Sequence, residues 1–332
     1  MINTPAKNML DFFIVTTSLK SGAIHRFKCF GIGDFSMTSL RQALEKELSA
    51  KELKLVPNSF DVVGNIAIFS EFPKELKRKK RKLIGNTLLK LNKNIKTVAI
   101  KTGKYSGRYR TPKLKIIAGE KTKETTHTEN GVRIKLNVEK CYFSARTGTE
   151  RLRIAKQIKK GEEVLVMFAG VLPFALIIAR HSRAKEIYAV EINAKAYKYG
   201  LENIKLNKIK NIKSFKGDVD KILPRTNKKF DRILMPLPKS SDDYLELALS
   251  KLKKGGVIHF YTFVNENEFP DAAVKRIKKF CKPKILKITK CGHYAPYTYR
   301  VCVDFRPFSL QRKAASGYCC GSASNRPSLT DS

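Results

Sequence analysis

Three positions that could bind a ligand follow three consecutive apolar segments of the chain. Gly170 lies in the segment 168–173, Glu191 follows about 20 residues later, and Asp218 comes next. A glycine lets a ligand approach the backbone, and a helix that starts behind it offers free N–H groups. A carboxylate at Glu191 can accept hydrogen bonds from both hydroxyls of a ribose, and Asp218 can bind an adenine amino group. The three positions predict a site for a cofactor that contains adenosine.

The glycine pattern also indicates which adenosine cofactor to expect. The chain lacks the GxGxxG pattern that holds a dinucleotide pyrophosphate, and it has no GKS or GKT loop for a nucleotide triphosphate. A cofactor without phosphates needs only one glycine at this loop. We therefore expect S-adenosylmethionine rather than NAD.

The elements that must position these residues alternate regularly after residue 161. EEVLVMFAG, EIYAVEIN, IKSFKGD, FDRILMPLP and GGVIHFYTF are typical of strands, and PFALIIARHS and AKAYKYGLENIKLNKI of helices. This alternation predicts an α/β fold with a doubly wound, mainly parallel sheet. Ligands bind beyond the carboxyl ends of the strands in such sheets, where the three positions fall.

The first part of the chain has a different pattern. Residues 40–53 are predicted as one amphipathic helix, 58–69 as one strand and 74–93 as a helix with a basic cluster, and 96–119 as two short strands around a loop. We predict an unassigned region over 1–55, a small α+β RNA-binding domain over 56–125, the main domain over 126–306 and a disordered tail over 307–332.

The charge balance points to a polyanionic partner. The chain has 67 Lys and Arg against 29 Asp and Glu, a net charge of +38. The cations are spread along the whole chain, which favours nucleic acid over a membrane surface. A lysine-rich proteome is the alternative explanation for such a charge.

The cysteines and the apolar segments indicate the compartment. None of the seven cysteines forms a CxxC pair or a zinc-ligand cluster with histidine, so we expect free thiols and no metal site. No apolar segment is long enough for a signal peptide or a membrane span. We expect a cytoplasmic protein that binds no membrane and acts as a monomer.

Several motifs resemble the archaeal and eukaryotic tRNA (guanine-37-N1)-methyltransferases and their wyosine-pathway relatives. They are SFDVVGNIAI, GRYR, HTENGVRIKLNVEKCYFSARTGTERLRIA, MFAGVLPFALIIA, VEINAKAYKYGLENIKLN, GDV, PLPKS and GGVIHFY. The stretch FSARTGTER followed by MFAG is the most specific part. The resemblance covers residues 58–304 and implies a Rossmann-like class I methyltransferase domain that uses S-adenosylmethionine and acts on the anticodon loop of tRNA.

The resemblance also implies roles for individual residues. Glu150 in GTER matches the general base of the family, and Arg110 in GRYR, or less closely Arg108, matches the arginine that steadies the target base. The positions that match cofactor-binding residues are Tyr142, Arg151, Phe168, Gly170, Glu191, Ile192, Asp218 and Val219, with Pro236 in the adjoining loop.

The chain departs from the common family pattern at three positions. An aspartate is replaced by Val166, a second glycine by Leu172, and the asparagine of an Asn-Leu-Pro loop by Pro236. An asparagine could hydrogen-bond the target base, and a proline side chain cannot. These changes resemble an archaeal subgroup with a Pro-x-Pro loop, some of whose members also methylate 4-demethylwyosine.

The proposed chemistry requires a base and a cation. The N1 nitrogen of guanine carries a proton at neutral pH, so a carboxylate must take this proton as N1 attacks the methyl group. An arginine can stabilise the charge that develops on O6. Glu150 and Arg110 suit these roles. In the structural alternative, Glu150 only favours the N-terminal dipole of its helix.

Other residues are predicted to contact the substrate. Arg146 could reach an RNA phosphate or the cofactor, with a surface salt bridge as the alternative. Tyr105 and Tyr109 lie among basic residues, a pattern suited to an unpaired base, although buried strand tyrosines would look the same. Pro238 and Lys239 are predicted to shape the pocket for the flipped purine, with a strand terminator as the alternative.

The leading hypothesis is an enzyme that makes N1-methylguanosine at position 37 of tRNA. Methylation of 4-demethylwyosine, alone or as a second activity, is the first alternative. Transfer of an aminocarboxypropyl group from the same cofactor is the second, and Glu150 in the TER motif disfavours it. A catalytically inactive RNA-binding protein is the alternative from a different class, which the set Glu150, Glu191 and Asp218 disfavours.

Overall fold

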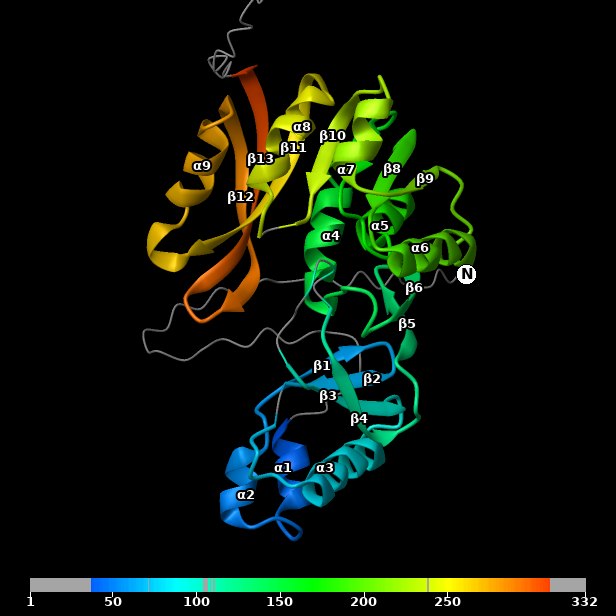
Figure 1. Ribbon diagram of the computed structural model, residues 1–332, viewed down its shortest axis with the longest axis vertical. Coiled ribbons are helices and arrows are strands. Elements are labelled where there is room, and N and C mark those ends of the chain that lie inside the picture. The colour runs from blue at the N-terminus through cyan, green and yellow to red at the C-terminus, as the bar shows by residue number, and fades with distance from the viewer. Residues whose placement is uncertain are drawn as a thin grey trace, which may run out of the picture. The chain divides into compact units, whose positions relative to one another are not determined.

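The structure is a computed structural model that describes residues 37–70, 72–103, 107, 109, 111–237 and 239–310. Its first part is a four-stranded sheet with three helices (Figure 1). Strand order is β1-β2-β3-β4, and only the β2–β3 pair is parallel because α3 connects these two strands. The elements are α1 (Met37–Leu44), α2 (Ala50–Leu55), β1 (Phe60–Val63), β2 (Ile66–Phe69), α3 (Arg78–Leu91), β3 (Thr97–Lys101) and β4 (Leu114–Gly119).

Two predictions for this part are wrong in detail. The segment predicted as one helix is two, because Ser49 caps α2 in a reciprocal capping box with Glu52. The segment predicted as one strand is the β1–β2 hairpin, whose turn contains Gly64 at φ +56°. A side chain at position 64 would also collide with Thr125, since a Cβ there would lie 2.1 Å from Thr125 Oγ1.

The first helices share a core with the four-stranded sheet. Leu40, Leu44 and Leu48 are buried in one cluster with Phe69 of β2 and Leu88 of α3. The predicted division at residue 55 cuts through this cluster. We therefore propose that α1 and α2 belong to the small domain.

The second part contains a seven-stranded sheet of order β12-β13-β11-β10-β7-β8-β9. Strand β13 runs in the direction opposite to the other six strands. A two-stranded sheet, β5 (Glu124–Glu129) and β6 (Val132–Asn137), precedes it. The strands of the seven-stranded sheet are β7 (Glu163–Val166), β8 (Glu186–Glu191), β9 (Ile212–Lys216), β10 (Phe230–Met235), β11 (Leu252–Asn265), β12 (Cys281–Ala295) and β13 (Thr298–Leu310). Its α-helices are α4 (Gly148–Ala155), α5 (Pro173–His181), α6 (Ala194–Leu206), α7 (Val219–Ile222), α8 (Leu245–Ser250) and α9 (Asp271–Lys278).

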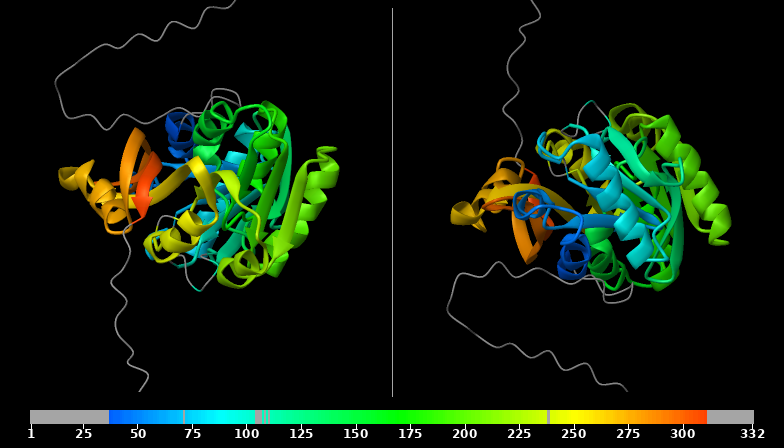
Figure 2. Two further views of the ribbon diagram at one scale, coloured as in Figure 1. Left: turned by 90° about the horizontal axis from the view of Figure 1, so that it is seen from above. Right: turned by 90° about the horizontal axis from the view of Figure 1, so that it is seen from below.

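Alternate residues of the central strands belong to two cores, one on each face of the sheet. On β7, Val164 and Val166 join the cluster that contains residues of α4, α5 and α6, whereas Leu165 joins the cluster with α7, α8 and α9. Helices therefore cover both faces, as the end-on views show (Figure 2). This arrangement confirms the predicted doubly wound, mainly parallel fold.

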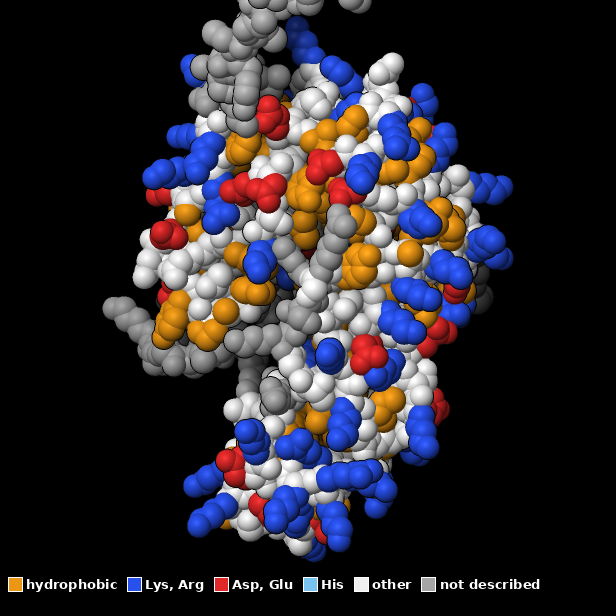
Figure 3. Space-filling model, in the orientation of Figure 1, with side chains coloured by type: hydrophobic (Ala, Val, Ile, Leu, Met, Phe, Trp, Pro, Cys, Tyr) orange, Lys and Arg blue, Asp and Glu red, His pale blue; other side chains and the backbone are white. Residues whose placement is uncertain are grey.

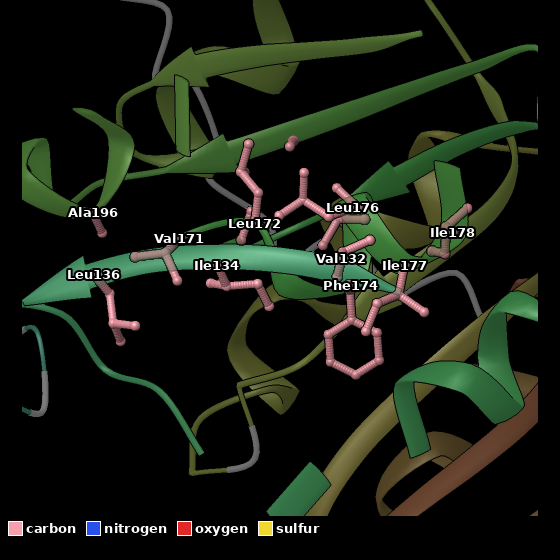
Figure 4. Packing of buried hydrophobic residues seen from close by; sticks show 14 of the residues in the cluster. Val132, Ile134, Leu136, Val171, Leu172, Phe174, Leu176, Ile177, Ile178 and Ala196 are labelled. Carbon is pink, nitrogen blue, oxygen red and sulfur yellow. The ribbon is translucent and has the colours of Figure 1, made fainter. Parts of the chain in front are cut away.

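The two-stranded sheet is attached to the first core. Ile134 of β6 and its apolar neighbours lie against the segment 171–178, which runs from the glycine loop into α5 (Figure 4). Asn203 of α6 binds both backbone groups of Lys135 and the carbonyl of Val171, at 2.7–3.1 Å. The packing thus fixes the loop that follows β7.

The C-terminal boundary differs from the prediction. Strand β13 continues to Leu310, so the first four residues of the predicted tail belong to the sheet. Residues 311–332 of that prediction lie outside the described residues. Within the described part of the chain, no helix has the length and apolar character needed to cross a membrane.

Candidate active site and cofactor-binding loops

The loop between β7 and α5 has an unusual backbone. Phe168, Gly170 and Leu172 all have positive φ angles, of 54°, 58° and 70°. Only glycine adopts this region without strain. Of the three family positions that this chain replaces, Leu172 is therefore the one whose replacement strains the backbone. Its buried side chain lies directly over Gly200 of α6, where a Cβ would come within 2.8 Å of Leu172 Cγ. Gly200 therefore makes the room that Leu172 needs.

Glu191 lies at the carboxyl end of β8 and joins two loops. Its Oε2 accepts a hydrogen bond from the Gly170 amide at 2.6 Å, and its Oε1 accepts one from the Asn193 amide at 2.7 Å. Burial raises the pKa of this carboxyl, and these backbone N–H groups oppose the rise. Since a carboxylate accepts about four hydrogen bonds, both oxygens keep capacity for a ribose diol.

The remaining predicted cofactor positions lie at the same edge of the sheet. Asp218 follows β9 and caps α7, and the Gly217 amide donates to the Glu191 carbonyl at 2.9 Å. Ile192 is half-buried directly after Glu191, and Val219 is buried at the start of α7. These residues surround the carboxyl ends of β7, β8 and β9, where a doubly wound sheet binds its ligand.

The residues present fit an adenosyl cofactor without phosphates. A Cβ built on Gly170 would meet only the Tyr142 carbonyl, at 3.7 Å, so the space above the loop is open. Glu191 and Asp218 offer acceptors for a ribose and an adenine amino group. The donor set therefore supports the predicted S-adenosylmethionine.

Glu150, the predicted base, lies in the first turn of α4 with a side chain that is 5% exposed. Its Oε1 accepts hydrogen bonds from the Tyr261 hydroxyl at 2.7 Å and from Arg153 Nη2 at 2.8 Å, and its Oε2 accepts one from Arg153 Nε at 2.6 Å. Because burial raises the pKa of Tyr261 well above its usual range, this hydroxyl stays a donor. These donors fix the orientation of the Glu150 carboxyl group.

Tyr261 also connects Glu150 to the glycine loop. The Tyr261 ring packs edge-on against Phe174, with ring centroids 5.8 Å apart. Phe174 is the second residue of α5 and follows the loop that contains Gly170. The predicted base is therefore separated from the predicted cofactor loop by two aromatic side chains.

Beyond Arg153, a chain of charged groups continues along the same face of the sheet towards Glu162, which precedes β7. Arg153 binds Asp304, whose carboxylate accepts a hydrogen bond from His259 Nδ1 at 2.6 Å. Arg232 donates from Nη1 to His259 Nε2 at 3.0 Å and forms an ion pair with Glu162. Because an arginine only donates, His259 is the neutral Nδ1–H tautomer, and burial lowers its pKa accordingly.

The same network explains a group that resembles a metal site. His259, Cys302 and Asp304 place ligand atoms within 4.8 Å of one another. Arg153 and Arg232 donate to two of these residues, and their positive charges oppose a cation at this position. We therefore interpret this cluster as an ion-pair network.

Two predicted site residues have structural partners. Arg151 forms a bidentate pair with Glu129, both bonds 2.6 Å long, and also binds Thr147 Oγ1 and the Ser144 carbonyl. Arg146 forms a salt bridge with Asp61 of β1, the alternative named for it. Arg151 thus orders the segment that contains Tyr142, and its predicted cofactor contact stays a prediction.

The remaining substrate positions are only partly described. Pro236 is half-buried directly after β10, and Lys239 is exposed. The Ser241 hydroxyl is buried against the Leu237 and Tyr261 carbonyls, which holds this loop beside the tyrosine that binds Glu150. Pro238, Arg108, Arg110 and Tyr105 lie outside the described residues, and Tyr109 is exposed.

The partners of Glu150 were not among the predicted site residues. Arg153 stands three residues after Glu150 on a predicted helix, a spacing that brings side chains together and could have been noticed. Tyr261 and Asp304 lie more than 100 residues away in the sequence, on β11 and β13. Tyr261 ends the motif GGVIHFY, but no local pattern pairs it or Asp304 with Glu150 and Arg153.

Comparison with protein families and curated proteins gives a consistent result. Residues 125–289 match the TRM5/TYW2 methyltransferase domain, and residues 40–122 match the TYW2 N-terminal domain. The tRNA (guanine(37)-N(1))-methyltransferase Trm5b of Pyrococcus abyssi is 43% identical over 76% of this chain and 76% of its own. The tRNA 4-demethylwyosine(37)-methyltransferase Taw21 of Saccharolobus solfataricus is 33% identical over 74% of this chain and 92% of its own.

A solved structure shares the fold as well. The complex of aTrm5 and tRNALeu superposes with a TM-score of 0.71 at 34% identity, over 80% of this chain and 77% of that one. The matched share includes most of both parts of the chain, so the similarity is not confined to the seven-stranded sheet.

Proposed function

Because the chain belongs to the TRM5/TYW2 methyltransferase family, we propose that it transfers a methyl group from S-adenosylmethionine to N1 of guanosine 37 in tRNA. The observation that carries this proposal is the buried Glu150 carboxyl group, which Arg153 and Tyr261 orient and which Tyr261 and Phe174 connect to the helix that follows the glycine loop. A carboxylate at this position could accept the N1 proton of guanine.

The chain's own residues divide the work as follows. When bound, the cofactor supplies an electrophilic methyl group on a sulfonium. Glu191 and Asp218 orient its adenosine, and the open backbone at Gly170 admits it. Glu150 takes the proton from N1, and Arg110 is proposed to stabilise negative charge on O6.

One observation favours a second candidate, methylation of 4-demethylwyosine at the same tRNA position. Pro236 replaces the asparagine of the common family loop and offers no side-chain hydrogen bond to a guanine. A relative whose name gives this substrate is 33% identical to the chain. The apolar proline is compatible with a larger tricyclic base.

We further propose that the enzyme acts as a cytoplasmic monomer that approaches tRNA through its charge. Cys141, Cys281 and Cys302 are buried free thiols, and burial raises their pKa, so they stay protonated. Unpaired thiols of this kind suit a reducing compartment.

The test is mass spectrometry of nucleosides from tRNA that has been incubated with the protein and S-adenosylmethionine. Transcripts with guanosine 37 and tRNA with 4-demethylwyosine 37 serve as substrates, and a transcript with adenosine 37 is the control. N1-methylguanosine supports the leading proposal, a product only from 4-demethylwyosine supports the second candidate, and an aminocarboxypropyl adduct overturns both. The Glu191→Ala protein should bind the cofactor poorly and give no product.

A further inference from the structure

The hairpin of β12 and β13 carries a group of aromatic residues at its turn. The turn lies at the carboxyl end of β12, which runs parallel to β11, so it projects from the same edge of the sheet as the cofactor loops. We call residues 290–300 the hairpin tip. Tyr294 and Tyr297 there are 59% and 68% exposed. Apolar side chains gather on the surface at the lower end of this hairpin in Figure 3.

Tyr297 occupies a position that normally selects another residue type. It follows Pro296 in the two-residue turn and has φ 55°, in the left-handed region. Turns with proline first prefer glycine or asparagine at the next position, so tyrosine here strains the backbone. Its side chain is largely exposed, so packing does not explain the choice. An exposed aromatic ring at a strained position indicates a binding role.

A row of rings leads from the tip back to the active site. Tyr294 stacks on Phe263 of β11, with ring centroids 3.9 Å apart and planes 25° from parallel. The Arg300 guanidinium lies 6.0 Å from the Phe263 ring and donates to the Tyr142 hydroxyl at 3.0 Å. Tyr142 is a predicted site residue next to the glycine loop.

Arg300 has an N–H group that forms no hydrogen bond with the residues that the structure describes. This group is Nε, which is buried. A guanidinium has five N–H donors and Arg300 is only half-buried, so it could bind an acceptor on a ligand in addition to the Tyr142 hydroxyl. A phosphate oxygen or a base carbonyl provides such an acceptor.

The charge of the hairpin identifies the ligand class. The hairpin tip contains two cations, Lys290 and Arg300, and no Asp or Glu of its own, and Lys282, Lys284 and Lys287 lie further along β12. One carboxylate, Glu266 of the neighbouring segment, accepts a hydrogen bond from the Tyr299 hydroxyl. Aromatic rings interspersed with cations bind unpaired nucleotides, because every base can stack and every phosphate is anionic.

We propose that the hairpin tip binds the unpaired nucleotides next to the target base, with a base stacked on Tyr294 or Tyr297 and with Arg300 on its phosphate or carbonyl. This inference rests on the proposed tRNA activity and adds the surface that grips the loop around position 37. It makes Tyr294, Tyr297 and Arg300 positioning residues that act on RNA binding.

The chain contains no tryptophan, which allows a direct test. A Tyr297→Trp protein carries one fluorophore at the tip, and a Phe308→Trp protein carries one at another exposed position of β13. Titration with an anticodon stem–loop RNA should quench the first protein and leave the second unchanged. If saturating RNA quenches neither protein, the proposal is overturned. Equal quenching of both proteins also overturns it.

A second comparison separates stacking from folding. Tyr297→Gly removes the ring and fits the positive φ better, so its stability should equal or exceed that of the parent. Its affinity for the stem–loop should fall roughly tenfold, the effect of losing one stacked base. Phe308→Ala, the matched control, should change affinity less than about twofold. Unchanged affinity in Tyr297→Gly contradicts the proposal.

The two proposals fail in different ways. If the parent modifies no nucleoside but the RNA still quenches the Tyr297→Trp protein, the methyltransferase proposal fails and the hairpin proposal holds. If the parent methylates tRNA and the tip variants behave like the parent, the hairpin proposal fails alone. Concentration-dependent dimerisation that Tyr297→Gly abolishes would assign the tip to a second copy of the chain and overturn the RNA assignment.

Discussion

The carboxylate of Glu150 is surrounded by donors rather than by solvent. Arg153 binds both of its oxygens and Tyr261 binds one, so the side chain faces the interior instead of the first-turn amides of α4. A contribution to the helix dipole would not require these contacts. At the scale of the residue, the geometry therefore speaks against a role limited to the helix dipole, and the role of Glu150 as the base stays a prediction.

The Glu150→Gln protein should lose methyl transfer while it still binds cofactor and tRNA. Glutamine keeps the size of the side chain and its contact with Tyr261, but it cannot accept the N1 proton. A general base contributes on the order of 10²–10⁴-fold, so the single-turnover rate at saturating substrates should fall by that factor.

Glu162→Gln is the matched control, because it breaks the Arg232 pair at the other end of the same network. This protein should lose comparable stability and keep its rate. A Glu150→Gln rate within about threefold of the parent would rule out Glu150 as the base.

At the scale of elements, the glycine loop depends on a packing exchange between α5 and α6. Leu172 takes a left-handed conformation at the start of α5, and Gly200 of α6 leaves space for its side chain. The missing family glycine is thus offset by a glycine 28 residues later in the chain. The conformation of the glycine loop is therefore explained only by Leu172 and Gly200 together.

Gly200→Ala should destabilise the protein, although alanine usually stabilises a helix interior by about 1 kcal/mol over glycine. The added Cβ would meet Leu172 at 2.8 Å, and overpacking typically costs about 1–3 kcal/mol. Urea unfolding measures the change.

In the double variant Leu172→Gly/Gly200→Ala the loss should be smaller than the sum of the two single losses, because glycine at 172 removes both the collision and the backbone strain. Additive effects of the two substitutions in this cycle would show that the residues do not interact.

The opposite edge of the sheet gives a pH-dependent contribution to stability. Lys253 and Lys228 lie beside Glu163 of β7, at 2.8 and 2.9 Å, and hydrogen bonds from these lysines lower its pKa to about 2. A lowered carboxyl pKa stabilises the folded state above the usual value, and this contribution disappears as pH falls from about 4.5 towards 2.

Glu163→Gln should therefore lower the free energy of unfolding at pH 7 by about 1 kcal/mol, and by much less at pH 3. Urea titrations of both proteins at the two pH values measure the difference. The same deficit at both pH values would show that the carboxylate charge does not contribute.

The whole molecule presents a strongly positive surface. Lys and Arg side chains lie over both parts of the face in Figure 3, and Asp and Glu are fewer. The net charge of +38 creates a field that attracts RNA before any specific contact forms.

Affinity for tRNA should consequently fall steeply as salt rises, since each phosphate contact releases a counterion. Plotted as logarithms, the dissociation constant and the salt concentration should give a line with a slope of several units. A slope near zero between low and physiological salt would favour the alternative that the charge reflects only a lysine-rich proteome.

The sequence by itself determined the fold class, the order of the cofactor loops and the family. Regular alternation of strands and helices places Gly170, Glu191 and Asp218 at one edge of a parallel sheet, because the carboxyl ends of parallel strands lie together. Local patterns contain this information, since strand and helix periods depend on near neighbours. Short-range patterns failed where turns intervene, as at Gly64 and Ser49.

Only the tertiary structure decided what surrounds each of these residues. Tyr261 and Asp304 meet Glu150 and Arg153 because β11 and β13 pair in the sheet, and no spacing in the chain records that register. Gly200 compensates Leu172 because α6 packs across the glycine loop. Hydrogen bonds and packing act over a few ångströms in space, whereas a sequence orders residues only along the chain.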